Sequence, residues 1–441
     1  QTFKTGSKIF AGDVLGGINS AIITLPQALA FGVATGFGAG AGIWGAIILC
    51  FVAGILGPKV PLISGTTGPV AIVVASMMLA LNNNLQAAVT VLLTAAILQI
   101  LASLTNLPRM VKYVPYPVIS GFMNGVGVII IILQINPLMG HKAMSSTVST
   151  VMSLHHSIST LNHDAVFIGI VTLLIVFAIP KKINKYIPSQ IVALIFCTWL
   201  SVKIGLHLDR IEQISVAFPH LVRPDLDIHH IIKYLPYAFT IAIVFSAESM
   251  LTGLVSDSLT KTRHSPKQLL AAQGIGNMLI PFFGGVPATA AIARTSVAIK
   301  SGAQTRIAGV IHSLVLLASM FLLGGVMSKI PMAALAGVLI VTAWRMNEFA
   351  VIKDIFGRKI KTAMFQYLIT MAATVIFDLT VAIIIGILFS VIMFVLKVSD
   401  MTVNVADVDP AKIDIADKDG KLYGTKVVYV TGPLYFGTSN K

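Results

Sequence analysis

Long apolar runs follow one another along almost the whole chain, separated by short polar connections. Runs that are apolar on every side predict helices surrounded by lipid rather than by water. Most approach the roughly 20 residues that a helix needs to cross a bilayer, whereas the third and tenth are clearly shorter. The fourteen predicted segments are 12–36, 41–57, 69–82, 86–105, 115–136, 164–180, 188–206, 234–256, 267–283, 288–300, 304–324, 331–344, 363–377 and 379–398.

Composition supports this all-α, polytopic membrane interpretation. Hydrophobic residues make up 56% of the 441 positions and charged residues 11%, against about 25% charged in soluble domains. The net charge of +14 could indicate a nucleic-acid partner. The basic residues lie in short clusters between apolar runs, however, and form no continuous face, so we expect membrane lipid and no nucleic acid around the chain.

Positive charge is distributed unevenly between alternate connections. Basic residues concentrate in the connections near 59, 109–112, 181–185, 261–267, 300–306 and 345–361, and are sparse in the others. By the positive-inside rule the basic set is cytoplasmic. An even number of crossings then places both termini in the cytoplasm, and we expect a multi-pass protein of the bacterial inner membrane.

Two regions outside the apolar runs are less informative. The outer connections 137–163 and 207–233 hold eight histidines without metal-ligand spacing, which a solvated surface explains, although a metal or pH-sensing role is an alternative. After about residue 400 aspartates become frequent and a strand is predicted around 426–431. We therefore divide the chain into a transmembrane domain at 1–399 and, at 400–441, a linker with the start of a small cytoplasmic domain.

The two short segments resemble each other. Each follows a glycine-rich extended stretch with a proline, and Pro69 and Pro287, about 220 residues apart, both suit the first turn of a helix. Pro26 and Gln27 in the first segment and Glu248 in the eighth have the same spacing. These pairs predict a seven-plus-seven inverted repeat, a feature of many transporters.

Extended backbone inside a membrane must line a cavity or be covered by protein. Two short helices that start there direct their N-termini, each with about half a positive charge, toward the bilayer midplane. The sequence therefore predicts a small-anion site between segments 3 and 10. Glycine and proline that merely kink two helices would be the alternative.

Three polar side chains within the apolar segments could serve this site. Glu248 is a candidate carrier of a proton or cation, with Thr252 one turn later on the same face. Arg294 could attract the anion or pair with Glu248, unless it extends to the cytoplasmic rim. Gln27 could contact the substrate together with Phe31, or could make one interhelical hydrogen bond.

Several other functions find no support in the residues. There is no Walker motif for ATP-driven pumping, and the glycines of 36–42 join two apolar segments instead of following a strand. Cys50 and Cys197 build no disulfide framework or metal site. No nucleophile–base pair or metal-ligand set occurs in the apolar segments, so we expect a transporter, not an enzyme, without a cofactor other than a coupling ion.

The motifs that surround these residues resemble those of the SulP (sulfate permease) family of anion transporters. They are TLPQALAFGVATG at 24–36, LISGTTGPVA at 62–71, AAQGIGN at 271–277, FFGGVPATAAIARTSVAIKSGAQTRIAG at 282–309 and VVYVTGPLYFG at 427–437. The resemblance implies a UraA-like fold, a homodimer and a C-terminal STAS domain. It also implies a core domain of segments 1–4 and 8–11 that moves like an elevator against a gate domain of segments 5–7 and 12–14.

The resemblance also implies roles for single residues. By position, the residues that match substrate contacts of the family are Gln27, Phe31, Val70, Ala71, Ala293 and Arg294. Ala293 replaces a serine that is frequent in the family. Glu248 matches an acidic position that is proton-linked in some members and, as aspartate, binds sodium in others with threonines such as Thr67 and Thr252.

These expectations combine into one leading hypothesis and several alternatives. The leading one is proton-coupled symport of sulfate, a C4-dicarboxylate or bicarbonate, with the proton on Glu248. Sodium-coupled bicarbonate symport at Glu248, Thr252 and Thr67 is an alternative, as is an uncoupled exchanger or channel. Nucleobase transport would need a second carboxylate near segment 10, and no acidic residue occurs between Asp257 and Glu348.

Overall fold

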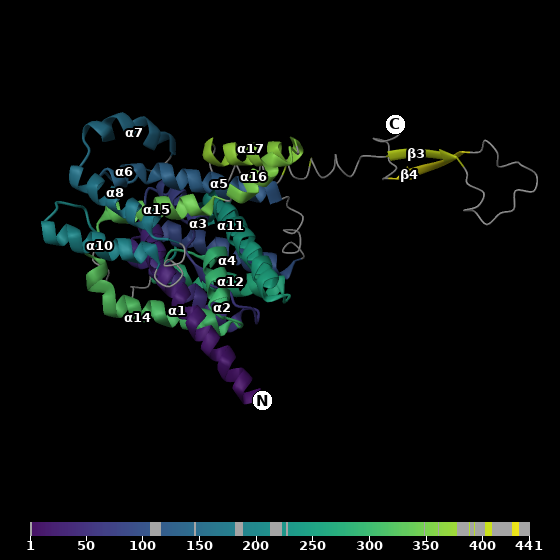
Figure 1. Cartoon of the computed structure of the whole chain (residues 1–441), viewed down its shortest axis with the longest axis horizontal. Coiled ribbons are helices and arrows are strands. Elements are labelled where there is room, and N and C mark those ends of the chain that lie inside the picture. Colours follow the sequence, from purple (N-terminus) through teal and green to yellow (C-terminus); the bar gives the residue numbers. More distant parts are fainter. Residues whose placement is uncertain are drawn as a thin grey trace, which may run out of the picture. The chain divides into compact units, whose positions relative to one another are not determined.

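The structure is a computed structural model, and it describes most of the chain. The described residues are 2–105, 116–144, 147–180, 188–211, 223–225, 228–347, 349–359, 361–376, 388, 392, 402–407 and 426–431. Contacts divide the chain into two compact units, Gln1–Ile383 and Ile384–Lys441. The described part of the first unit is mainly helical, with two very short strands (Figure 1).

Helices occupy thirteen of the fourteen predicted apolar segments. Most ends agree within four residues, but the helices of the first and eighth segments begin ten and six residues before the predicted starts. The helices of the first unit are α1 (Thr2–Ala34), α2 (Ala39–Leu56), α3 (Gly68–Ala80), α4 (Leu85–Leu104), α5 (Tyr116–Leu133), α6 (Ile135–Leu138), α7 (Thr147–Ser159), α8 (His163–Ala178), α10 (Ser189–Ile204), α11 (Ile228–Thr260), α12 (Pro266–Leu279), η2 (Ile280–Phe283), α13 (Ile292–Lys300), α14 (Ile307–Met327), α15 (Met332–Met346), α16 (Phe349–Gly357) and α17 (Lys361–Ile376). Of the last predicted segment, 379–398, only residues 388 and 392 are described.

Two helices occupy stretches that the sequence suggested were connections. Helix α7 lies in the connection 137–163, predicted to be an outer one, and meets α8 at a bend of 117°. Helix α16 lies in the basic connection 345–361. Both have one apolar face, so a search for continuous apolar runs does not detect them.

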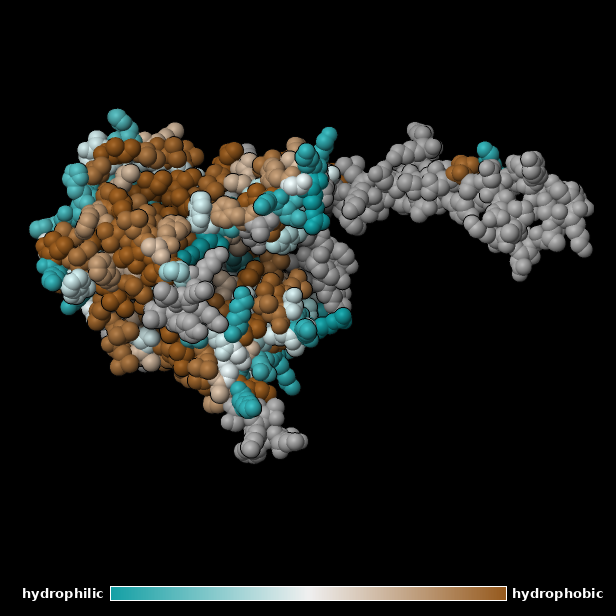
Figure 2. Space-filling view, in the orientation of Figure 1, coloured by the Kyte–Doolittle hydropathy of each residue, from teal (hydrophilic) through white to brown (hydrophobic). Residues whose placement is uncertain are grey.

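The exterior of the first unit suits lipid. In the described part of the chain, seven helices are long and apolar enough to cross a bilayer, or eight if the bent pair α7–α8 counts as one span. Large hydrophobic side chains are exposed on many helices, and hydrophobic residues cover much of the visible face of this unit in Figure 2. Exposed apolar surface on this scale indicates contact with lipid.

Two segments from distant parts of the chain cross in the interior. Strand β1 (Ser64–Gly65) pairs antiparallel with β2 (Thr289–Ala290), with Ser64 opposite Ala290. Helix α3 follows β1, with Pro69 in its first turn as predicted. Helix α13 follows β2 but begins at Ile292. Placing Pro287 in a first helical turn was therefore wrong, because the chain stays extended through Ala290 to complete the strand pair. We call 63–80 the first arm and 286–300 the second arm.

Helix α2 packs closely against the second arm. A Cβ atom at Gly45 would lie 1.9 Å from the carbonyl oxygen of Val286. The Val286 N–H in turn donates to the carbonyl of Ala41, at 2.9 Å. No other residue type fits at Gly45 without movement of the backbone, so this glycine fixes how near the second arm lies to α2.

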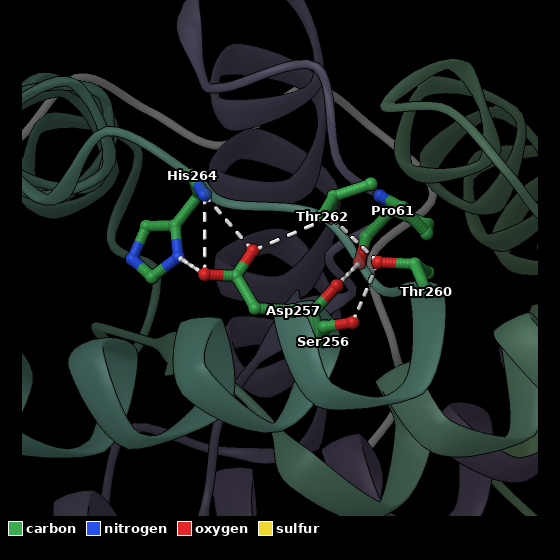
Figure 3. A network of polar contacts seen from close by, with 6 residues as sticks. All are labelled: Pro61, Ser256, Asp257, Thr260, Thr262 and His264. Atoms are coloured by element: carbon green, nitrogen blue, oxygen red, sulfur yellow. Dashed lines mark hydrogen bonds and ion pairs between the residues drawn. The ribbon is translucent and has the colours of Figure 1, made fainter.

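The connection between α11 and α12 is organised by one carboxylate (Figure 3). Lys261 has a positive φ of 55°, and the Thr262 N–H donates to the carbonyl of Asp257, as in a Schellman ending. The Asp257 side chain accepts from the His264 N–H and lies 2.7 Å from His264 Nδ1. The end of α11 is thereby tied to the start of α12.

The second unit contains a small antiparallel sheet. Strand β3 (Thr402–Asp407) pairs with β4 (Lys426–Thr431), with Thr402 opposite Thr431. The strand predicted from the sequence after residue 425 is confirmed. Its assignment to a STAS domain stays a prediction.

Candidate functional site

Glu248 lies in α11 where the two arms cross. It is 9% exposed, and its Oε2 accepts hydrogen bonds from Thr67 Oγ1 at 2.5 Å and from Thr289 Oγ1 at 2.8 Å. The two threonine oxygens are 3.5 Å apart. One hydroxyl comes from each arm, so the carboxylate links both arms to α11.

Arg294 lies on the other side of the same crossing. It is the third residue of α13 and only 2% exposed, so the structure excludes the alternative that its side chain extends to an aqueous rim. Nε donates to Gln27 Oε1 of α1 at 3.0 Å, and Nη2 donates to the Thr66 carbonyl of the first arm at 2.6 Å. Nη1 is buried without a hydrogen-bond partner.

Gly65 makes room for this guanidinium group. A Cβ atom at position 65 would lie 2.1 Å from Nη1 of Arg294. The third residue of the first arm's helix, at the position that Arg294 holds in the second arm, is Val70, which is also buried. Among the described residues of the two arms, the second arm alone therefore contributes a guanidinium group to the crossing.

The two charged groups do not pair directly. No ion pair joins Arg294 to Glu248, both of which the structure describes. Neither Thr67 nor Ala291, the residues before α3 and α13, caps its helix with a side chain. The positive ends of two helices and a guanidinium group thus meet in one place, which favours an anion.

The other residues predicted to contact substrate lie around the crossing. Phe31, Val70 and Ala71 are buried, Gln27 is half-buried and Ala293 is exposed. A cavity of about 20 Å³, with room for roughly one water molecule, adjoins Phe31 and Ala71. Residues of α5 and α15, among them Ile130 and Leu339, close its other side.

Thr252 is not joined to Glu248 in the structure. Its hydroxyl donates to the carbonyl of Ala290 in β2, at 2.8 Å. One turn further along α11, Ser256 donates to the carbonyl of Pro61 ahead of the first arm. The hydroxyls of α11 therefore hold the arms, and the role of Thr252 as a ligand of a coupling ion stays a prediction.

Thr289 and Thr66 contribute to the site although the sequence did not identify them. Both lie in or beside the paired strands β1 and β2, which meet only when segments more than two hundred residues apart come together. One signal in the sequence could have identified Thr289. It lies in the second glycine- and proline-rich stretch, as Thr67 lies in the first. Among the described residues, no three His, Cys, Asp or Glu side chains gather to hold a metal ion.

Comparison with known proteins identifies the family. The model of the Sulfate permease family matches residues 10–373. Bicarbonate transporter BicA of Picosynechococcus is 31% identical over 99% of this chain and 81% of its own length. A putative sulfate transporter of Bacillus subtilis, YvdB, is 29% identical over 97% of this chain and 81% of its own length.

Solved structures agree with this assignment. The transmembrane domain of a cyanobacterial BicA superposes with a TM-score of 0.78 at 34% identity, over 85% of this chain and 97% of that one. The structure of SLC26A9 shares the fold, with a TM-score of 0.83 at 20% identity over 98% of this chain and 73% of that one. The chain is thus an integral, multi-pass membrane protein that belongs to the sulfate permease family of anion transporters.

Proposed function

We propose that this protein is a secondary active transporter that carries a small oxyanion, such as bicarbonate, sulfate or a C4-dicarboxylate, together with a proton on Glu248. The single observation that supports it most is Nη1 of Arg294, a buried cationic donor without an acceptor beside two helix N-termini that lack side-chain caps. A buried donor of this kind is costly unless a ligand satisfies it.

The charges at the crossing account for coupling. With Glu248 ionised, its negative charge offsets that of Arg294, and an incoming anion finds little net attraction. A proton on Glu248 removes the negative charge, so the anion and the proton each favour binding of the other. Because a buried unpaired charge is expensive, a carrier loaded with both crosses more readily than one loaded with the anion alone.

Movement is proposed to follow an elevator mechanism within a fourteen-span inverted repeat, in which α3 and α13 are half-helices. Helices α1, α2, α4, α11, α12 and α14 pack mainly with one another, and α5, α8, α10, α15 and α17 pack among themselves. The cavity beside Phe31 and Ala71 lies between helices of these two groups. This division supports a core domain that slides along a gate domain.

The remaining assignments are proposals of the same kind. We place the protein in a bacterial inner membrane as a homodimer, with both termini in the cytoplasm and a STAS domain that begins after about residue 425. The uneven distribution of basic residues supports the orientation.

The test is uptake of labelled sulfate, bicarbonate and fumarate into proteoliposomes with an imposed pH gradient. Glu248→Gln keeps a hydrogen-bonding side chain of similar size but cannot release a proton. We expect it to lose gradient-driven accumulation while retaining anion exchange. Full accumulation by this variant contradicts proton coupling through Glu248.

Sodium-coupled bicarbonate symport is the second candidate, and a specific observation favours it. Glu248 Oε2, Thr67 Oγ1 and Thr289 Oγ1 lie within 3.5 Å of one another, and hard cations bind clusters of oxygen ligands. The BicA relatives are bicarbonate transporters. Uptake of bicarbonate driven by a sodium gradient alone, at equal pH on both sides, supports this candidate over the first.

A further inference from the structure

None of the contacts described for the site involves the QGIGN sequence at 273–277. It lies on α12, and Gln273 and Asn277 are one helical turn apart and both buried. Buried amides in an apolar helix are expensive unless they are hydrogen-bonded. The Gln273 side chain is directed at the first arm and the Asn277 side chain at the second.

Gln273 holds the first arm. Its Nε2 donates to Ser64 Oγ at 2.8 Å. Ser64 directly precedes Gly65, which lies against the Arg294 guanidinium, and Thr66, whose carbonyl accepts from Arg294. The contact from α12 is therefore one residue away from the anion side of the crossing.

Asn277 holds the second arm. Its Oδ1 accepts from the backbone N–H of Ala288 at 3.1 Å, and its Nδ2 donates to Gln99 Oε1 of α4 at 3.2 Å. Ala288 directly precedes Thr289, which donates to Glu248. This contact is one residue away from the carboxylate side of the crossing.

The two glycines of the sequence explain how α12 comes close enough. A Cβ atom at Gly274 would lie 2.5 Å from Ile100 of α4, and one at Gly276 would lie 2.5 Å from Leu49 of α2. Larger residues would push α12 away from both neighbouring helices. At that greater distance the two amides could not hold Ser64 and Ala288 in their present places.

We propose that Gln273 and Asn277 are positioning residues that set the place of the two arms relative to Arg294 and Glu248, so that Gln273 tunes anion binding and Asn277 tunes coupling. The inference rests on the proposed function. A purely structural role predicts that loss of either amide lowers stability and overall rate alike. Positioning predicts that the two losses change different kinetic constants.

The experiment uses the full chain in proteoliposomes, with labelled bicarbonate and sulfate as probes. Gln273→Leu is expected to raise the KM for the anion about five- to tenfold, with kcat changed less than twofold. Asn277→Leu is expected to reduce the stimulation of uptake by a pH gradient, or by a sodium gradient, about fivefold, with a smaller change in KM.

Two further variants give the test its controls. Asn277→Asp keeps the acceptor for the Ala288 N–H, and Gln99, whose Nε2 has no partner at present, can turn its amide and donate to the new carboxylate. We expect it to restore most of the coupling. Gln268→Leu removes an amide from the same helix that donates only to the carbonyls of Leu56 and Gly57. Its KM and coupling should match those of the wild type.

Hydrogen exchange provides a readout that does not depend on transport. Asn277→Leu should speed exchange of the Ala288 amide, whereas Gln273→Leu should not. Equal exchange in both variants, equal kinetic changes in both, or failure of Asn277→Asp to restore coupling overturns the inference. If the wild type carries no tested anion, the proposed function fails instead, and exchange at Ala288 still decides whether Asn277 holds the second arm.

Discussion

The two arms share a backbone plan but differ in chemistry. Each has a two-residue strand and then a helix, and the strands pair with each other. The third residue of each helix is buried, but it is Val70 in the first arm and Arg294 in the second. The repeated backbone supplies two positive helix ends, and a single side-chain difference puts the full charge on one arm.

Glu248, unlike Arg294, belongs to neither arm and is bonded by both. It accepts one hydroxyl from each, Thr67 from the first and Thr289 from the second. Displacement of either arm therefore changes the environment of the carboxylate, whereas Arg294 is carried by the second arm alone. Two arms with the same backbone plan thus both bind the carboxylate of Glu248, while only the second arm carries the guanidinium group of Arg294.

The largest effect should come from removing the charge of Arg294, which only the second arm carries. Arg294→Met leaves Gln27 Oε1 and the Thr66 carbonyl without their donor and removes the only guanidinium group described at the crossing. Loss of a buried, hydrogen-bonded charge costs about 2–5 kcal/mol. We expect initial uptake of labelled bicarbonate and sulfate to fall a hundredfold or more.

Val70→Ala is the matched control on the first arm. Val70 is also matched to a substrate contact, but its side chain supplies only apolar contact and no charge, so uptake should fall only a few-fold, far less than in Arg294→Met. Thermal unfolding in detergent checks that both variants fold. Equal losses from Arg294→Met and Val70→Ala would mean that the two arms contribute alike, contrary to the comparison.

A smaller effect should follow from crowding the guanidinium group. Gly65→Ala places a methyl group where Nη1 of Arg294 lies, so the side chain must move and lose a charge-assisted contact. We expect KM for the anion to rise about tenfold, since such bonds contribute about 1.5–3 kcal/mol.

Gly68→Ala provides the comparison within the same arm. Its Cβ would meet only the flexible tips of Ile130 and Met346, which can move aside at low cost. KM measured for this variant should change less than threefold. An equal rise in both variants would show that the first arm tolerates no added volume anywhere, and that contact with Arg294 is not special.

The smallest effect should come from the two threonines that donate to Glu248, one from each arm. Thr67→Val and Thr289→Val each remove one of the two hydroxyls on Glu248. Because the other hydroxyl remains, each loss should cost about 1 kcal/mol and shift the dependence of uptake on the coupling cation about fivefold. The two shifts should be equal within error, and a large effect from only one threonine would break the symmetry.

The long apolar helices of the fold could be predicted from the sequence. Uninterrupted apolar runs such as 41–57 and 86–105 correspond closely to α2 and α4, because helices surrounded by lipid need no alternating pattern. The charged residues of the site were accessible for the same reason. Glu248 and Arg294 stand out because ionisable side chains are rare within apolar segments.

The details of the crossing were not accessible from local pattern. Pro287 looked like a helix start, yet its segment stays extended because Thr289 and Ala290 pair with Gly65 and Ser64. Thr289, which donates to Glu248, lies in the same strand pair, and Ala288, which donates to Asn277, directly precedes it. A threonine or asparagine among small apolar residues carries no local sign of such a partner.

The pairing of Ser64 with Ala290 also sets an order of events on the ribosome. At about 5–20 residues per second, the second strand is made some 11–45 seconds after the first. During that interval the backbone groups of Ser64 and Gly65 lack their partner strand, and lipid cannot satisfy them. The newly made first half must therefore keep the first arm in contact with water or protein until the second half arrives.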